Sequence, residues 1–145
     1  MKYILSSFFL VFFSQAAFSA ELTPGNLIGK YKVEARAGFQ KVYVNFRVLN
    51  TTEFEIQRIY SDGRVDESCN GTFGLNHSLF WDFDVLANGK TFNGVFTCPS
   101  NRSKEMDFNI DFKNTTTDDL VRGTNVTVTS SMARGMRINA YVKKQ

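Results

Sequence analysis

Apolar and polar residues alternate one by one along most of the chain. Val42, Val44, Phe46 and Val48 alternate with other, mostly polar, residues, and the same pattern recurs in several later segments. A period of two is typical of a β-strand that turns one face to a core and the other to water, and helical periodicity is nearly absent. The pattern predicts about eight or nine strands, near residues 30–36, 40–49, 53–60, 64–75, 79–86, 91–98, 105–113, 124–131 and 135–143.

Turn-forming residues separate these strands at close spacing. Asp62-Gly63 and Asn88-Gly89 are pairs that suit two-residue hairpins. One segment departs from the alternation, because Thr116 is followed three residues later by Asp119 and the stretch ends at Gly123. These are the start and stop signals of a short helix near 116–122. We therefore expect an all-β fold, a single antiparallel meander barrel of about eight strands with one short helix.

The Asn88-Gly89 turn predicts a register for the strands on either side of it. A two-residue turn pairs residues whose numbers sum to 177, which places Phe92 opposite Val85 and Phe96 opposite Trp81. These partners all lie on the apolar face, and a slip of one residue would destroy that agreement. A three-residue turn at 76–78 would in the same way pair Phe73 with Trp81.

The two cysteines conflict with this register. Cys69 and Cys98 would lie at opposite ends of strand 79–86, roughly 20 Å apart at ~3.3 Å per residue. A disulfide needs Cα atoms within ~7 Å, yet two cysteines in an oxidising compartment usually pair. We favour a Cys69–Cys98 disulfide, which requires a longer loop or a shifted register around residues 70–78. Two free thiols are the alternative.

The first nineteen residues do not follow the strand pattern. Lys2 precedes an apolar run from Ile4 to Phe13, and small residues follow, with Ala17 and Ser19 placed for cleavage after Ser19. This is the layout of a secretory signal peptide, and its ten or so apolar residues are too few for the roughly 20 that span a bilayer. We expect a signal peptide at 1–19, one barrel domain at 20–145, and a protein exported to the periplasm or secreted by a bacterium.

Composition and charge narrow the chemistry. The chain of 145 residues has 17 Lys and Arg against 14 Asp and Glu, with one His and two Cys. Both signs are interspersed, so there is no basic stripe for nucleic acid. One His and two Cys cannot build a Cys/His zinc site, and no glycine-rich phosphate loop occurs. We expect no metal, no cofactor and no nucleic-acid partner.

The remaining polar residues offer little catalytic chemistry. His77 lies in a predicted turn. Asp82 and Asp84 share a strand face and lie about 7 Å apart. This spacing suits a glycosidase pair or calcium ligands, but two such residues more often belong to the solvent-exposed face of a strand. Asp118 and Asp119 are explained by helix capping. Without a base and nucleophile together, we expect that the protein is not an enzyme.

Aromatic residues supply the candidate binding site. Fifteen Phe occur, of which five lie in the leader, and most of the others fall on the apolar strand faces. The interior of an eight-stranded barrel is either filled by side chains or holds one small ligand, and both alternatives stay open. The candidate ligand-binding residues are Tyr31, Phe46, Phe54, Trp81, Phe83, Phe92, Phe96 and Phe108.

Gly29-Lys30-Tyr31, at the start of the first strand, resembles the Gly-x-Trp signature of lipocalins and their calycin relatives. The resemblance implies that Tyr31 plugs the closed end of a barrel and that a basic residue of the final strand, Arg134 or Arg137, packs against it.

Three functions follow as hypotheses. The first is an exported non-catalytic binding module that holds a small hydrophobic ligand in the barrel. The second is an envelope or secreted protein-interaction domain, of inhibitor or adhesin type, with a filled core. The third is a small outer-membrane β-barrel. We expect the partner to be a small hydrophobic ligand or another protein, with no integral insertion into a membrane.

Overall fold

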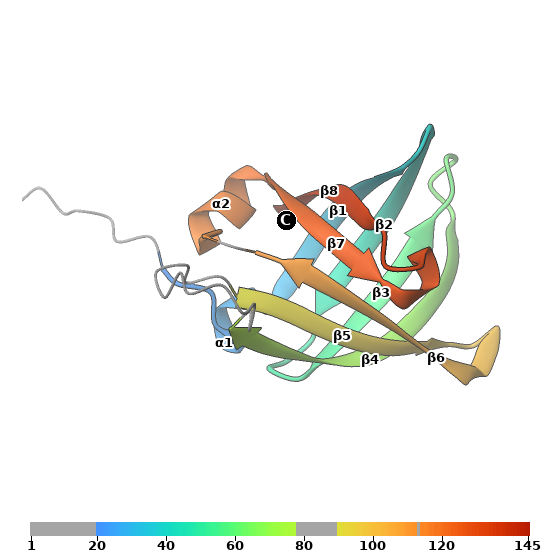
Figure 1. The fold of residues 1–145 in the computed structure, drawn as a ribbon, viewed down its shortest axis with the longest axis horizontal. Helices are drawn as coiled ribbons and strands as arrows, with labels where there is room; N and C mark the ends of the chain where they lie inside the picture. The colour runs from blue at the N-terminus through green and yellow to red at the C-terminus, as the bar shows by residue number, and fades with distance from the viewer. Residues whose placement is uncertain (1–19, 78–89, 113) are drawn as a thin grey trace, which may run out of the picture.

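A computed structural model of the chain describes residues 20–77, 90–112 and 114–145, which form a closed antiparallel barrel of eight strands (Figure 1). Each strand pairs with its neighbours in sequence, and the last pairs with the first. The predicted all-β barrel with a short helix near 116–122 is therefore confirmed. The strands are β1 (Gly29–Ala37), β2 (Gln40–Val48), β3 (Glu53–Ile59), β4 (Val65–His77), β5 (Lys90–Cys98), β6 (Asn101–Asp111), β7 (Thr124–Ser130) and β8 (Arg137–Lys144).

The described residues also form three short helical segments, one before the first strand and two between later strands. They are α1 (Pro24–Leu27), α2 (Thr117–Arg122) and the 3₁₀ turn η1 (Ser131–Ala133). Both α-helices begin with a capping box, in which Thr23 and Thr116 accept hydrogen bonds from the backbone three residues on. The sequence analysis anticipated α2 and missed α1, whose single turn is too short for periodicity to reveal.

The pairing of β5 corrects the predicted hairpin. β5 lies between β4 and β6, so both of its edges are occupied. Phe92 pairs with Leu75 instead of Val85, and Phe73 pairs with Gly94 instead of Trp81. The predicted register around Asn88-Gly89 is therefore wrong, although alternation in the two segments made it self-consistent. The predicted strand 79–86 lies outside the described residues, as does the predicted signal peptide at 1–19.

The same pairing settles the conflict over the cysteines. Residues of β4 and β5 that face each other have numbers that sum to 167, as Asn70 and Thr97 do. Cys69 and Cys98 continue this register, with Cα atoms 4.3 Å apart and a disulfide between them. The predicted disulfide is confirmed. The predicted turn at 76–78 is wrong, because β4 continues through His77 and pairs with β5, which brings the two cysteines together.

One end of the barrel, which we call the capped end, is covered by chain outside the strands. α1 and α2 both lie there (Figure 1), and Leu22, Leu27 and Leu120 insert into the core with almost no exposure. The Thr117 amide donates to the Ala20 carbonyl at 3.2 Å, which ties the N-terminal segment to α2. The turns at residues 38–39, 60–64, 99–100 and 131–136 lie at the opposite end, which has no such cover among the described residues.

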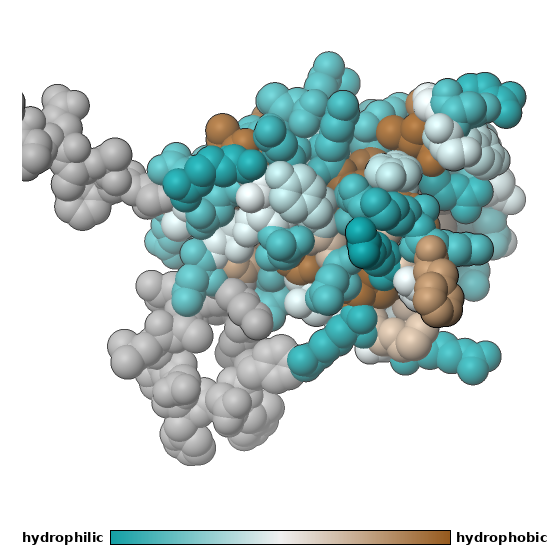
Figure 2. All heavy atoms as spheres, turned by 90° about the horizontal axis from the view of Figure 1, so that it is seen from above, coloured by the Kyte–Doolittle hydropathy of each residue, from teal (hydrophilic) through white to brown (hydrophobic). Residues whose placement is uncertain are grey.

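The barrel wall separates apolar from polar side chains. In β1, for example, Tyr31 is buried while Lys30 and Lys32 are exposed. Hydrophilic residues cover most of the face seen in Figure 2, with apolar surface between them in patches. The apolar side of each strand therefore faces the interior, where the candidate site lies.

Candidate functional site: a cavity at one end of the barrel

The interior has two unlike halves, and the half next to the capped end is filled by aromatic rings. Phe54 has no exposed surface and packs against Phe92 and Phe108, with ring centroids 5.8 and 5.5 Å away. Phe73 stacks on Phe92 at 4.4 Å with the two planes 10° apart. Ring pairs in edge-on and offset geometries contribute about 0.5–1.5 kcal/mol each beyond their burial. This half is a packed core.

The other half of the interior contains a cavity of about 560 Å³. Its floor is formed by Phe46, Phe96 and Phe108, the outer rings of the aromatic core. Its walls are aliphatic, because the inward positions nearest the turns carry small and branched residues in place of rings. The apolar wall residues are Val33, Ala35, Val44, Ile56, Met106, Ile110, Val128, Ile138 and Ala140, together with the disulfide. We call this end of the barrel the cavity end.

Charged side chains mark the mouth of the cavity. Arg58 forms an ion pair with Asp66, and the Tyr60 hydroxyl donates to the same carboxylate at 2.7 Å. The hydrogen bond from Tyr60, followed by the positive charge of Arg58, holds the pKa of Asp66 below its ordinary value. The Arg58 side chain lines the cavity and is 60 % exposed, so the mouth reaches solvent.

A β-bulge creates this arrangement. Gln57 pairs with Ser68, but Ile59 pairs with Val65, so Arg58 stands opposite two residues of β4, Asp66 and Glu67. A bulge bends its strand and re-aims side chains. Both carboxylates thereby reach the cavity mouth, although they are neighbours that regular alternation would send to opposite faces.

Glu67 is less exposed than Asp66 and is tied to the neighbouring β5–β6 hairpin. Its carboxylate accepts hydrogen bonds from the backbone amide and the hydroxyl of Ser100, at 3.2 and 2.8 Å. A Glu67 oxygen and the sulfur atoms of Cys69 and Cys98 lie within 4.8 Å of one another. Both sulfurs are joined in the disulfide, so neither offers the thiolate that binds a metal. Glu67 and the disulfide therefore do not form a metal site: Glu67 is a polar group at the cavity mouth, and the disulfide is part of the apolar wall.

The structure distributes the predicted ligand-binding residues over both halves. Phe46, Phe96 and Phe108 line the cavity, whereas Phe54 and Phe92 lie in the packed core and Tyr31 lies next to the capped end. Trp81 and Phe83 lie outside the described residues, as do Asp82 and Asp84. His77 is the last residue of β4.

Tyr31 is held at the capped end by its hydroxyl, which donates to the Leu27 carbonyl of α1. Burial raises the pKa of Tyr31 to about 12. The basic group on its ring is Lys144, whose Nζ lies 5.6 Å from the ring centroid and donates to the Asn26 carbonyl at 2.9 Å. The prediction of Arg134 or Arg137 for this role is wrong, because β8 begins at Arg137 and reaches Tyr31 only at Lys144.

The aliphatic wall and the charged mouth were missed by the sequence analysis. Arg58 did carry a signal, because it shares parity with Phe54 and Ile56 in a strand whose even positions are apolar. A charge at an inward position marks a polar site or a strand end. No comparable signal existed for Asp66 and Glu67, since their placement depends on the bulge.

Comparisons with known proteins add no constraint on the function, because no family model, no curated protein and no solved structure matches the chain. Within the described part of the chain, none of the helices has the length and apolar character that a membrane span requires.

Proposed function

We propose that the protein is an exported, non-catalytic binding module that holds a small hydrophobic ligand in the barrel. The observation that carries this proposal is the cavity of about 560 Å³, which falls within the range of about 300–1,000 Å³ typical of small-molecule sites. Its walls are apolar and its few charged groups are confined to the mouth. A ligand with an apolar body and one polar end fits this layout.

Export is supported by the disulfide, since disulfides persist in oxidising compartments. A non-catalytic role is supported by the polar groups of the mouth, which satisfy one another. Asp66 is engaged by Arg58 and Tyr60, and Glu67 is engaged by Ser100. No histidine lines the described part of the cavity, and each of its two neighbouring carboxylates is already engaged by another group.

The two other hypotheses fit less well. An interaction domain with a filled core is disfavoured by the cavity itself. An outer-membrane barrel points apolar residues outward and keeps a polar lumen, whereas β1 points Lys30 and Lys32 outward and buries Tyr31.

A cavity-blocking variant tests the proposal. Ala35 lines the cavity, and Ala35→Trp would fill part of it. Lys32→Trp adds the same side chain to the exposed face of the same strand and serves as the control. We expect the neutral apolar dye phenylnaphthylamine to gain fluorescence with the wild type and with Lys32→Trp, and to bind Ala35→Trp at least about tenfold more weakly, since several apolar contacts are excluded.

Equal binding of the dye by the three proteins would place it elsewhere and overturn the proposal. If Ala35→Trp does not fold, Ile138→Trp blocks the same cavity from β8. Mass spectrometry of protein purified from its own cells under native conditions should also show a bound compound that is lost on denaturation.

A further inference from the structure

The turns at the cavity end carry exposed apolar residues. Phe39, at the tip of the β1–β2 turn, is completely exposed, and Met136, in the β7–β8 turn, is 65 % exposed. These are the two most exposed large apolar side chains that the structure describes. Tyr60 and Val65 flank the β3–β4 turn and are also exposed. Three of the four turns at this end thus present an apolar side chain to water.

The same turns are rich in positive charge. Residues 36–41, 60–65, 99–104 and 131–136, which we call the rim, contain one acidic residue, Asp62. The basic residues of the rim are Arg36, Lys41, Arg64, Arg102, Lys104 and Arg134. With six basic residues and one acidic residue, the rim has a formal charge of +5, against +3 for the whole chain. Four acidic residues border the rim, namely Glu34, Asp66, Glu67 and Glu105, and the first three of these are engaged by Lys41, Arg58 and Ser100 respectively.

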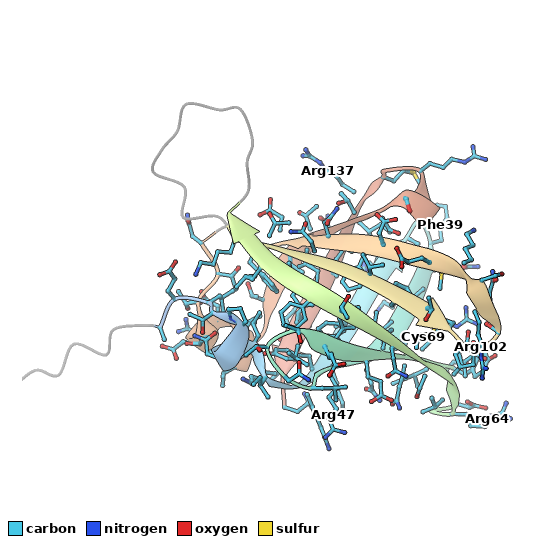
Figure 3. All side chains as sticks on the ribbon, turned by 90° about the horizontal axis from the view of Figure 1, so that it is seen from below. Phe39, Arg47, Arg64, Cys69, Arg102 and Arg137 are labelled. Carbon is cyan, nitrogen blue, oxygen red and sulfur yellow. A yellow bond between two sulfur atoms is a disulfide. The ribbon has the colours of Figure 1, made fainter. Side chains whose placement is uncertain are left out.

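Most of this charge is not neutralised locally. Lys41 pairs with Glu34 and Arg64 pairs with Asp62. Among the residues that the structure describes, the other four basic residues of the rim make no ion pair. Figure 3 shows Phe39, Arg64 and Arg102 at the cavity end, whereas Arg47 projects from the barrel wall away from it.

Apolar tips surrounded by basic side chains complement one kind of surface in particular. An anionic lipid bilayer attracts each nearby Lys or Arg electrostatically and accepts apolar side chains at the level of its headgroups. We propose that the rim docks on anionic lipid surfaces, so that the cavity mouth faces the bilayer from which a hydrophobic ligand would be taken or to which it would be delivered. The transfer role rests on the proposed function, but the docking itself can be measured without any ligand.

Cosedimentation with lipid vesicles tests the docking. We expect the wild type to bind phosphatidylglycerol vesicles, to bind phosphatidylcholine vesicles far more weakly, and to be released when salt is raised from roughly 0.1 M to roughly 0.5 M. Arg102→Gln/Arg134→Gln should lower the partition coefficient about 25-fold, at about fivefold for each charge. Phe39→Ser should lower it about tenfold.

Two matched controls lie outside the rim. Arg47→Gln removes an exposed charge from the barrel wall, and Val121→Ser removes an exposed apolar residue from the capped end. Both controls should bind vesicles as the wild type does. All proteins are produced in the same way and share the same N-terminus, so differences among them report on the substituted positions alone.

Three results would overturn the proposal: no binding of the wild type to anionic vesicles, equal losses in the rim and control variants, or a wild-type dimer that Phe39→Ser dissociates while vesicles are not bound. The last result would assign the rim to a second copy of the chain. Rim residues 39, 102 and 134 do not line the cavity, so these variants should bind phenylnaphthylamine like the wild type. Wild-type protein that binds the dye but not the anionic vesicles would refute the docking alone, whereas wild-type protein that binds the vesicles but not the dye would refute the proposed function alone.

Discussion

Removal of the Cys69–Cys98 disulfide should lower the stability of the barrel by several kcal/mol. The bond joins residues that are 29 apart in sequence, and both cysteines are buried. In the chain-entropy description, a cross-link that closes a loop of this length removes freedom from the unfolded chain equivalent to about 3.6 kcal/mol at 25 °C. We therefore expect Cys69→Ala/Cys98→Ala to unfold with a free energy lower by about 3–4 kcal/mol.

Urea denaturation followed by circular dichroism measures this change. With a slope of about 1.5 kcal/mol per M, the midpoint should fall by roughly 2 M. The slope itself should rise, because an unfolded chain without the cross-link exposes more surface. A reductant should destabilise the wild type by a similar amount and leave the double variant unchanged, which separates loss of the cross-link from loss of the two buried side chains.

A small effect would refute the reasoning. If the double variant loses less than about 1 kcal/mol and the slope is unchanged, then the cross-link does not restrict the unfolded chain as the loop length implies. Mass measurement after alkylation of the unfolded wild type should meanwhile find no free thiol, since the protein's two cysteines are joined.

Other expectations concern packing, burial and pH. Gly71→Ala should destabilise the barrel by about 1–3 kcal/mol in urea titrations, because the added Cβ would lie 2.3 Å from the Val95 carbonyl oxygen; an unchanged midpoint would contradict this. Tyr31→Phe should cost about 1 kcal/mol through the lost hydrogen bond to Leu27, and should abolish the tyrosine that titrates near pH 12 in ultraviolet absorbance. Because the pKa of Tyr31 is raised in the folded state, its contribution to stability is complete below pH 10 and disappears as pH rises toward 12. The pKa of Asp119 is lowered, so its contribution is present above its ordinary value of 3.8 and disappears as pH falls below that value; Asp119→Asn should flatten the pH dependence of unfolding in that range.

The strands could be predicted from sequence because each one carries its own alternation. Val42, Val44, Phe46 and Val48 identify β2 without reference to any neighbour. Pairing is a different property, because two alternating segments match at any even shift. The Asn88-Gly89 turn favoured one such match, and the observed partner of Phe92 is Leu75 in β4. The disulfide was the one long-range constraint in the sequence that could have rejected the hairpin.

The charged mouth was beyond sequence reasoning for a related reason. Its geometry depends on a bulge that places Arg58 opposite both Asp66 and Glu67. A bulge is a property of two paired strands, and it cannot be predicted from the sequence of either strand alone. The position of Lys144 over Tyr31 likewise follows from where β8 begins, which is set by the length of the β7–β8 turn.

The distribution of side-chain size along the barrel explains why only one half is hollow. In the aromatic half, glycines make room for rings: a Cβ on Gly94 would lie 2.7 Å from the Phe108 ring, and a Cβ on Gly71 would lie 2.6 Å from the Phe54 ring. In the other half the inward positions of β1 and β8 that face each other are both alanine, Ala35 and Ala140.

Pairs of small residues with no ring opposite them leave space, and an eight-stranded barrel is wide enough for that space to admit a small molecule. Aromatic content alone therefore does not decide between a filled and a hollow interior. Whether the interior is filled or hollow depends on which positions along each strand hold the rings. Rings gathered at the capped end stabilise the fold and leave the cavity end empty. The same separation should allow the cavity wall to be altered, as in Ala35→Trp, with little loss of the stability that the aromatic core supplies.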